Sequence, residues 1–368
     1  MTVSEAAEPI HLSRTVLKSI RSAASHERQR AMRDLDPYDY VACWTEAESI
    51  DGKDCDALVF ILATKGCSWA LRSGCSMCGY TNDSSSRATD ESIWSQYQKA
   101  IKNLKDHRVV KIYTSGSFLD TFEISHPLRT RILSDLYPRV DEVVVETRHE
   151  YITEKNLGDV LQFRQKLMLA VGLESSNDRI LNYSVNKPSN YAHYLRATKT
   201  AAEMGFRVKS YLMLKPPFVS ELDSIEDAVK TTEEITSYTD TVSINPTNIQ
   251  KDTIVELMWR KGNYRPPWLW SVVEVLRRTH HLDRRVLSKP TGAGTVRGAH
   301  NCGKCDDRVM EAIADYSVHR DISSLEKVQC ECKSVWRSEL AISELSQPSY
   351  PTDYRMKIAK GSGSIAGI

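Results

Sequence analysis

Six short apolar runs, alternating with helix-like stretches between residues 58 and 245, constrain the fold of this 368-residue chain more than any other feature. The runs are residues 58–62, 109–113, 142–146, 168–173, 208–214 and 241–245. Near-continuous apolar runs of this kind are typical of strands covered on both faces, as in a parallel sheet. The helix-like stretches lie near residues 90–105, 126–136, 153–165, 190–204 and 223–237. Six strand–helix units in succession predict a parallel α/β fold, either an open barrel or a doubly wound sheet.

The alternation divides the sequence into three predicted parts. Residues 1–50 form an N-terminal extension with a predicted basic helix near residues 10–34. Residues 51–250 hold the six strand–helix units. Residues 251–368 lack the alternation and are rich in basic residues and cysteine, which predicts a small metal-binding C-terminal domain.

Charge and hydropathy narrow the class of binding partner and the cellular compartment that the sequence predicts. Lys and Arg number 49 against 48 Asp and Glu, and a net charge of +1 argues against indiscriminate binding to nucleic acid or membrane. No apolar stretch approaches the roughly 20 residues of a membrane helix, and the N-terminus lacks the apolar region of a secretory signal. We therefore expect a cytoplasmic protein, in which closely spaced cysteines bind metal more often than they form disulfides.

Cys67, Cys75 and Cys78 directly follow the first predicted strand. Three thiolates on one loop can converge on a single inorganic centre, and parallel α/β folds build their sites at this end of the strands. The centre is either zinc completed by a fourth ligand from elsewhere, or an iron–sulfur cube with one iron left open.

The spacing Cys67-x7-Cys75-x2-Cys78 after a first strand resembles the cysteine motif of the radical S-adenosylmethionine (SAM) superfamily. Its long first gap is similar to the branch that contains the Elongator catalytic subunit. The resemblance implies a partial (β/α)6 TIM-like barrel, a [4Fe-4S] cluster on the three cysteines, and SAM on the open iron. It also implies that the residues at the strand ends bind SAM and substrate.

Residues near the strand ends are the candidates for these roles. The expected SAM contacts are Met77, Tyr80, Gly116, Ser117 and Glu174. Glu146, Arg148, Lys215 and Asn245 are expected on the substrate side of the barrel mouth. Arg148 could bind a carboxylate of SAM or of the substrate, because a guanidinium pairs bidentately with either. For Arg148 and Lys215, an ordinary ion pair at a strand end is the alternative.

A second cysteine group comprises Cys302, Cys305, Cys330 and Cys332. Two tight pairs of thiolates suit a closed tetrahedral zinc site of structural role. A second iron–sulfur cluster is the main alternative, and His300 could replace one cysteine.

The stretch 251–300 contains ten basic and four acidic residues, with aromatic residues interleaved. The aromatic residues are Trp259, Tyr264, Trp268 and Trp270. Cations among aromatic rings suit RNA, where phosphates attract the charges and unstacked bases contact the rings. The alternative is that the rings belong to the core and the charges to a solvated face.

Three further segments, residues 245–248, 265–270 and 299–306, are similar to the archaeal radical SAM lyases of archaeosine synthesis (RaSEA). That resemblance implies a tRNA substrate, an electron donor protein, and as partner the lysine-transferring archaeosine synthase (ArcS). The partner would join lysine to a 7-cyano-7-deazaguanine base in the D-arm. This protein would then cleave the C–N bond of the lysine side chain through a 5′-deoxyadenosyl radical and leave archaeosine. The rival hypotheses are another radical SAM tRNA-modifying enzyme and a non-catalytic RNA-binding zinc protein.

Overall fold

The computed structural model describes residues 35–346. The helix predicted near residues 10–34 lies outside the described residues. Within 35–346, no helix combines the length and apolar character needed to cross a membrane.

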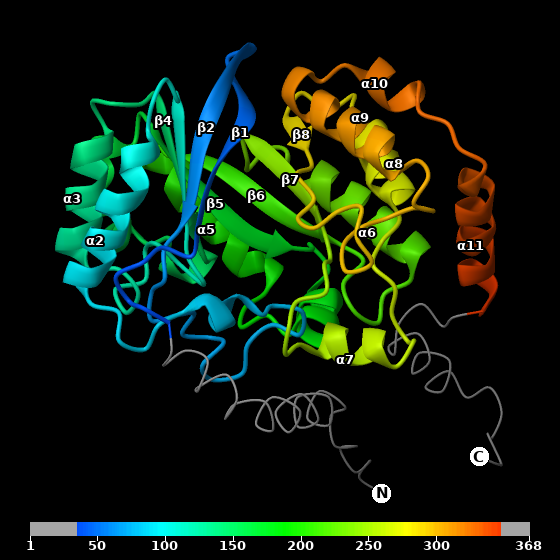
Figure 1. Ribbon diagram of the computed structural model, residues 1–368, viewed down its shortest axis with the longest axis horizontal. Coiled ribbons are helices and arrows are strands. Elements are labelled where there is room, and N and C mark those ends of the chain that lie inside the picture. The colour runs from blue at the N-terminus through cyan, green and yellow to red at the C-terminus, as the bar shows by residue number, and fades with distance from the viewer. Residues whose placement is uncertain (1–34, 347–368) are drawn as a thin grey trace, which may run out of the picture.

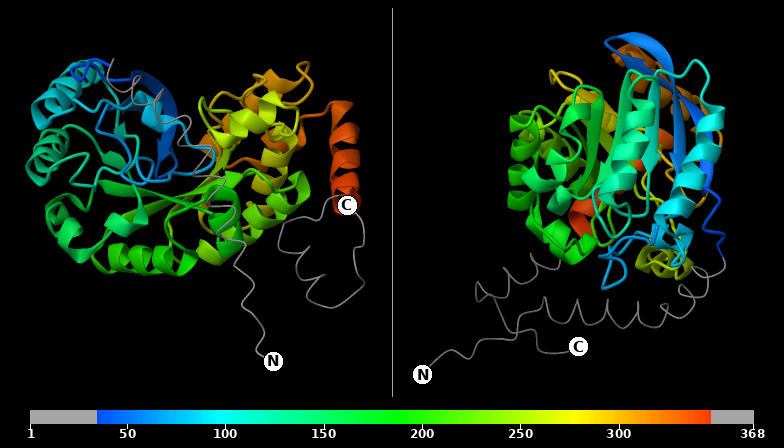
Figure 2. Two further views of the ribbon diagram at one scale, coloured as in Figure 1. Left: turned by 90° about the horizontal axis from the view of Figure 1, so that it is seen from below. Right: turned by 90° about the vertical axis from the view of Figure 1, so that its left-hand side faces the viewer.

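Eight strands form one sheet whose spatial order follows the sequence, from β1 to β8 (Figure 1). They are β1 (Ala42–Ile50), β2 (Lys53–Ile61), β3 (Val109–Tyr113), β4 (Glu142–Thr147), β5 (Leu167–Glu174), β6 (Arg207–Leu214), β7 (Thr241–Pro246) and β8 (Arg285–Leu287). The hairpin partners β1 and β2 are antiparallel, and every other neighbouring pair is parallel. A doubly wound sheet would reverse its strand order partway, so the sequential order identifies a barrel-type winding. The sheet curls into a half-barrel (Figure 2, left).

Most of the helices cover the outer, convex face of the sheet (Figure 2, left), but Ile254–Arg260 lies at the carboxyl ends of the strands and Cys332–Ser346 packs on the helix Glu221–Ile235 (Figure 1). The helices are α2 (Asp90–Ala100), α3 (His126–Leu136), α4 (Glu154–Gly158), α5 (Tyr191–Glu203), α6 (Glu221–Ile235), α7 (Ile254–Arg260), α8 (Leu269–Thr279), α9 (Asp306–His319), α10 (Ile322–Glu326) and α11 (Cys332–Ser346). Short 3₁₀ turns occupy Tyr80–Asp83, Ile101–Asn103, His149–Tyr151 and Leu161–Phe163, and a π-helical turn occupies Ile180–Val185. The main apolar core lies between these helices and the sheet.

All six predicted strands are confirmed as β2 to β7, but the strand at residues 42–50, within the predicted N-terminal extension, was missed. This strand is β1, which turns into β2 through Asp51 and Gly52. These two residues have φ of 51° and 71°, the left-handed backbone that a two-residue hairpin turn requires. Strand β8 was also missed, and it extends the sheet into the segment predicted as the C-terminal domain. The predicted boundaries at residues 50 and 250 stay predictions.

Ion pairs connect the two edge strands of the half-barrel. Lys289 Nζ lies 2.9 Å from Glu46 Oε1 and 3.1 Å from Glu48 Oε2, both on β1. Arg285 of β8 lies 2.8 Å from the Glu48 carboxylate and donates to the Ser49 carbonyl at 3.0 Å. Because β1 and β8 share no ladder, these side chains close the lower part of the barrel and leave the carboxyl ends of the strands as its mouth.

Candidate active site

The loop that carries Cys67, Cys75 and Cys78 leaves β2 at the barrel mouth. The side-chain amide of Asn186 donates to the Gly74 carbonyl at 2.8 Å, and the Trp69 indole donates to the Asn186 carbonyl at 3.0 Å. Cys67 is buried, and Cys75 and Cys78 are half-buried. The segment after β5 thus holds the loop against the mouth, with its three thiols on one loop as the sequence predicts.

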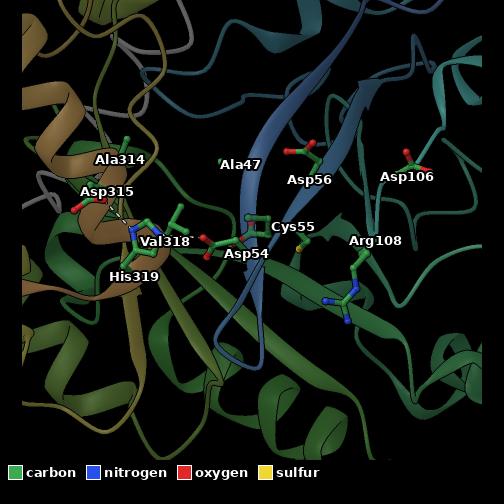
Figure 3. Close-up of a pocket in the computed structure, with 11 residues that line it drawn as sticks. Ala47, Asp54, Cys55, Asp56, Asp106, Arg108, Ala314, Asp315, Val318 and His319 are labelled. Atoms are coloured by element: carbon green, nitrogen blue, oxygen red, sulfur yellow. Dashed lines mark hydrogen bonds and ion pairs between the residues drawn. The ribbon is translucent and has the colours of Figure 1, made fainter.

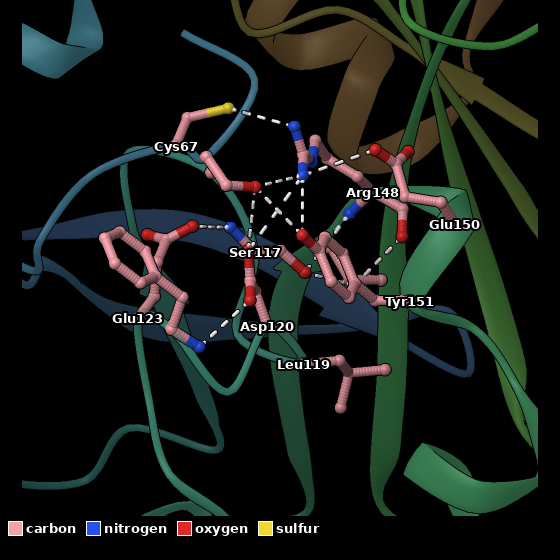
Figure 4. A network of polar contacts seen from close by, with 12 residues as sticks. Cys67, Ser117, Leu119, Asp120, Glu123, Arg148, Glu150 and Tyr151 are labelled. Carbon is pink, nitrogen blue, oxygen red and sulfur yellow. Dashed lines mark hydrogen bonds and ion pairs between the residues drawn. The ribbon is translucent and has the colours of Figure 1, made fainter. Parts of the chain in front are cut away.

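Arg148, which follows β4, lies against the cysteine loop at the centre of a polar network (Figure 4). Its Nη1 donates to Cys67 Sγ at 3.3 Å, and its Nη2 donates to Ser68 Oγ at 2.7 Å and to the Tyr151 hydroxyl at 2.8 Å. Glu150 lies 3.3 Å from the same guanidinium. The cation is therefore adjacent to a predicted cluster ligand, on the cysteine side of the mouth.

Gly116 is in close contact with the cysteine loop. An added Cβ would lie 2.8 Å from Cys67 Cα and 2.3 Å from Glu123 Oε1, so no side chain fits at this position. The backbone N–H of Ser117 donates to the same Glu123 oxygen at 2.6 Å, and Thr64 donates to the other at 2.6 Å. Burial raises the pKa of the Glu123 carboxyl to about 7. Sequence reasoning missed Glu123, although an acid close to a glycine-containing loop was a signal for it.

Two glutamates line the mouth on neighbouring strands. Glu174, at the end of β5, adopts φ 74° and accepts a 2.6 Å ion pair from Lys187. Glu146, at the end of β4, hydrogen bonds to Tyr211 of β6, and burial raises the pKa of its carboxyl to about 7. A carboxyl with this pKa can gain or lose a proton near neutral pH.

Lys215 and Asn245 complete the predicted substrate side. Lys215 forms a buried 2.6 Å ion pair with Glu221 of α6, whose other oxygen accepts from the Trp268 backbone at 2.8 Å. Lys215 thus forms an ordinary ion pair at a strand end, which the sequence analysis gave as the alternative to a role on the substrate side. Asn245, at the end of β7, accepts from Ser243 Oγ at 3.1 Å and is half-buried.

Two of the predicted SAM contacts, Met77 and Tyr80, differ in exposure. Met77 is buried in a small apolar cluster with Val219, Ile249 and Tyr264, so it packs the cysteine loop against the loops after β6 and β7. Tyr80 is 45% exposed.

Below the mouth lies a layer of buried charges that sequence reasoning missed. Lys111 of β3 is 1% exposed and donates to Glu46 and Glu48. Lys209 of β6 lies in the same layer, where burial and the neighbouring Lys111 lower the pKa of its ammonium to about 7. At the same level of the sheet, a small buried apolar cluster is formed by Ala57, Val109, Val144, Met168 and Ala170. The available signal was a lysine within each of two apolar strands.

The four C-terminal cysteines converge on one point, with all Sγ atoms within 4.8 Å of one another. Sγ–Sγ distances are 3.9 Å for Cys302–Cys305, 3.8 Å for Cys302–Cys330 and 3.6 Å for Cys305–Cys332. Four sulfurs about 2.3 Å from one tetrahedral ion are about 3.8 Å apart, so the donor set fits a single zinc ion. An iron–sulfur cube places each thiolate on its own iron, which separates the sulfurs further.

Neighbouring groups donate to these sulfurs. The Trp270 indole donates to Cys332 Sγ at 3.2 Å, and the Asn301 amide donates to Cys305 Sγ at 3.5 Å. Such outer donors orient thiolate ligands in metal sites. His300 bonds to the Gly298 carbonyl instead of joining the group. Within residues 35–346, the loop cysteines form no equally tight group.

The prediction that residues 251–300 present rings and free cations to RNA is wrong for most of its members. Tyr264, Trp268 and Trp270 are buried in the core. Arg277 pairs with Glu274, and Arg278 forms a two-bond pair with Glu226 of α6. Arg285, Lys289 and Arg297 are also engaged with carboxylates. Arg277 and Glu274 lie on the same helix, whereas the other pairs join different parts of the fold.

A cavity of about 580 Å³ lies at the opposite, amino-terminal end of the strands (Figure 3). Its lining includes Arg108, two aspartates of β2 (Asp54 and Asp56), and His319 of α9. None of the predicted site residues lines it, so it is separate from the mouth that carries the cysteine loop.

Comparison with known proteins gives extensive sequence relatives, of which two carry the same description. A protein of Methanosarcina acetivorans described as archaeosine synthase subunit beta is 39% identical over 338 residues, 89% of this chain and 98% of that relative. A protein of the same description from Thermococcus kodakarensis is 39% identical over 306 residues, 80% of this chain and 94% of that relative. No family model matches the sequence.

Solved structures are more distant. Elp3 of the archaeon Methanocaldococcus infernus is 19% identical with a TM-score of 0.47, and the match spans 61% of this protein and 59% of that structure. Methylornithine synthase (PylB) is 15% identical with a TM-score of 0.44, and the match spans 75% of this protein and 73% of that structure.

Proposed function

This chain belongs to the archaeosine synthase subunit beta family, and from that premise we propose that it is the radical SAM lyase that completes archaeosine on tRNA. In this proposal, the lysine-transferring archaeosine synthase (ArcS) first joins lysine to the nitrile of a 7-cyano-7-deazaguanine base in the D-arm. The present protein then cleaves the C–N bond of the lysine side chain and leaves the amidine of archaeosine.

One observation carries the proposal beyond the family: the cysteine loop lies at the mouth of a half-barrel, with a guanidinium against Cys67. Cys67, Cys75 and Cys78 would hold a [4Fe-4S] cluster, and Gly116, Ser117 and Glu174 would contact SAM. The missing side chain at Gly116 supports this assignment, because it lets the loop after β3 approach Cys67 closely. When bound, the cluster and SAM supply a 5′-deoxyadenosyl radical that abstracts hydrogen from the lysine side chain.

The residues of the mouth have separate tasks in this proposal. Arg148 binds a carboxylate beside Cys67, which favours that of SAM over that of the lysine. Glu146 faces the substrate from β4 and holds or moves a proton at the amidine nitrogen. Asn245, on β7, places its side-chain amide on the substrate side of the mouth.

The C-terminal cysteine centre has a structural role in the proposal. Zn²⁺ on Cys302, Cys305, Cys330 and Cys332 would tie the start of α9 to the start of α11, because these residues lie at the two helix starts. The Trp270 indole connects the same centre to α8.

The substrate and partners follow from the reaction. A base stacked in tRNA cannot reach a radical inside a barrel, so the modified base must leave the stack and enter the mouth. The reaction also needs an electron donor protein to reduce the cluster, and the lysine-transferring synthase to supply the substrate.

Metal analysis of anaerobically prepared protein tests the proposal. We expect about four iron and one zinc per protein molecule. Cys67→Ala should lose the iron and keep the zinc, whereas Cys305→Ser should lose the zinc. Cys43→Ser, which changes a half-buried thiol on β1, serves as the control and should keep both metals. Zinc without iron in the wild type would refute the radical enzyme and favour an RNA-binding zinc protein.

A further inference from the structure

The protein has six phenylalanines, and they divide into two groups. Phe60, Phe118, Phe163 and Phe206 are buried, with exposures of 0–6%. Phe122 and Phe218 are 45% and 46% exposed. Both follow strands at the barrel mouth: Phe122 lies in the loop between β3 and α3, and Phe218 in the loop between β6 and α6. Phenylalanine is among the residues most often buried, so this placement needs a reason.

Phe218 is also held in an unfavourable backbone conformation. Its φ is +68°, in the left-handed region that bulky residues rarely adopt. Four other non-glycine residues have positive φ at this end of the barrel: Glu174 is the last residue of β5, and Asn186, Lys215 and Asp252 lie in the segments that follow β5, β6 and β7. Such conformations cluster where function rather than stability dictates the backbone.

The loop around Phe218 is firmly anchored. Tyr264 donates to the Lys215 carbonyl at 2.6 Å, and Ser184 donates to the Pro217 carbonyl. Pro216 and Pro217 restrict the backbone just before Phe218, since each fixes its own φ near −65°. The loop therefore presents the ring of Phe218 to solvent from a rigid support, which lowers the entropy lost on binding.

The position of Phe218 relates it to the cysteine loop. Val219, the next residue, is 6% exposed and packs in the apolar cluster that contains Met77, which lies between Cys75 and Cys78. Phe218 thus lies on the rim of the mouth, next to the loop that would hold the cluster. On the rim near β3, Lys65 Nζ lies 5.7 Å from the centroid of the Phe122 ring and adds a cation to the second exposed ring.

We propose that Phe218 stacks on a nucleobase of the tRNA at the rim, with Phe122 and Lys65 as a second contact to the same RNA. This inference rests on the proposed tRNA substrate and replaces the rings of residues 251–300, which are buried. An exposed ring on a rigid loop suits a base, because every base has a flat face on which an aromatic ring can stack. A ring at the rim can also occupy the space that the extruded base leaves in the stack.

The test compares Phe218→Ala, Phe218→Trp and the control Tyr238→Ala. Tyr238 is 42% exposed and precedes β7, at the opposite end of the barrel from the rim. The probe is lysine-modified tRNA carrying a fluorescent label, titrated with anaerobically prepared full-length protein at two salt concentrations. Loss of one stacking contact predicts that Phe218→Ala raises Kd by about 5- to 150-fold. Phe218→Trp and Tyr238→Ala should stay near wild type.

Two further readouts distinguish stacking from other roles. The salt dependence of Kd should be the same in Phe218→Ala and wild type, because stacking involves no phosphate. Phe218→Gly should have an unchanged or higher Tm, since glycine adopts the left-handed backbone without strain. A marked fall in Tm would instead indicate a structural role and overturn the inference.

The outcomes separate this inference from the proposed function. If wild type neither binds nor converts lysine-modified tRNA, the proposed function fails. If wild type converts the tRNA and Phe218→Ala has an unchanged Kd, the stacking inference alone is wrong. Unchanged tRNA affinity with weakened binding of the partner synthase would assign the exposed ring to a protein interface and also overturn it.

Discussion

At the residue scale, Gly116 shows how the loop after β3 fits against the cysteine loop. Its Cα leaves no room for a methyl group, because Cys67 and Glu123 both lie within 3 Å of where a Cβ would be. The sequence predicted a small residue here from the expected approach to SAM. The contact with Cys67 was not predictable, since it depends on how two loops pack.

Gly116→Ala should therefore destabilise the protein by about 1–3 kcal/mol, the usual cost of overpacking a tight site, and lower its iron content. Gly158→Ala is the matched control, because nothing lies within 4 Å of its added Cβ and the position is helical. The control should gain about 0.5–1 kcal/mol. Chemical denaturation and iron analysis of both variants provide the measurement, and equal stability of the two would contradict the packing.

Glu146 gives a pH-dependent prediction at the same scale. Burial raises the pKa of its carboxyl to about 7, against an ordinary value of 4.5, with Lys209, Tyr211, Glu174 and Glu123 also facing it. The unfolded state releases this proton between about pH 4.5 and 7 while the folded state retains it, so rising pH in that window costs stability.

Glu146→Gln removes this cost. The difference in unfolding free energy, variant minus wild type, should thus rise by on the order of 1 kcal/mol or more between pH 5 and pH 8. Urea denaturation at the two pH values measures it. A difference that does not change with pH would show that the carboxyl titrates normally.

At the element scale, the six parallel strands and the helices between them were predictable, because each forms one continuous apolar or periodic run. Strand β1 was not, since its sequence is largely polar and its partner is an antiparallel hairpin; the Asp51-Gly52 pair was the local signal. The basic stretch was misinterpreted because charge partners can lie far apart in sequence. Arg278, for instance, pairs with Glu226 on another helix.

The ion pairs between β1 and β8 give the prediction at this scale. Glu48 is 5% exposed and balances Lys111, Arg285 and Lys289, so Glu48→Gln should destabilise the protein by about 3 kcal/mol. Glu203→Gln, in an exposed pair with Lys199, should cost about 0–0.5 kcal/mol. Denaturation of both variants at pH 7 measures the contrast. A similar small loss in both would mean that the pairs do not hold the barrel edges together.

At the scale of the whole molecule, the half-barrel separates three regions. The mouth carries the cysteine loop and the exposed rings, the layer beneath it holds buried charges, and the four-cysteine centre joins the helices that follow β8. The sequence predicted the mouth and both cysteine groups, because cysteine spacing is visible in one dimension. It did not predict the charge layer, whose members come from β1, β3 and β6 and the residues after β8.

Anaerobic turnover of lysine-modified tRNA with SAM and a reductant tests the central claim most directly. After nucleoside digestion and mass spectrometry, we predict archaeosine in place of the lysine-modified base, with 5′-deoxyadenosine formed alongside it. Cys67→Ala should yield neither product. Formation of 5′-deoxyadenosine by the wild type with no archaeosine would contradict the claim that this protein cleaves the lysine C–N bond.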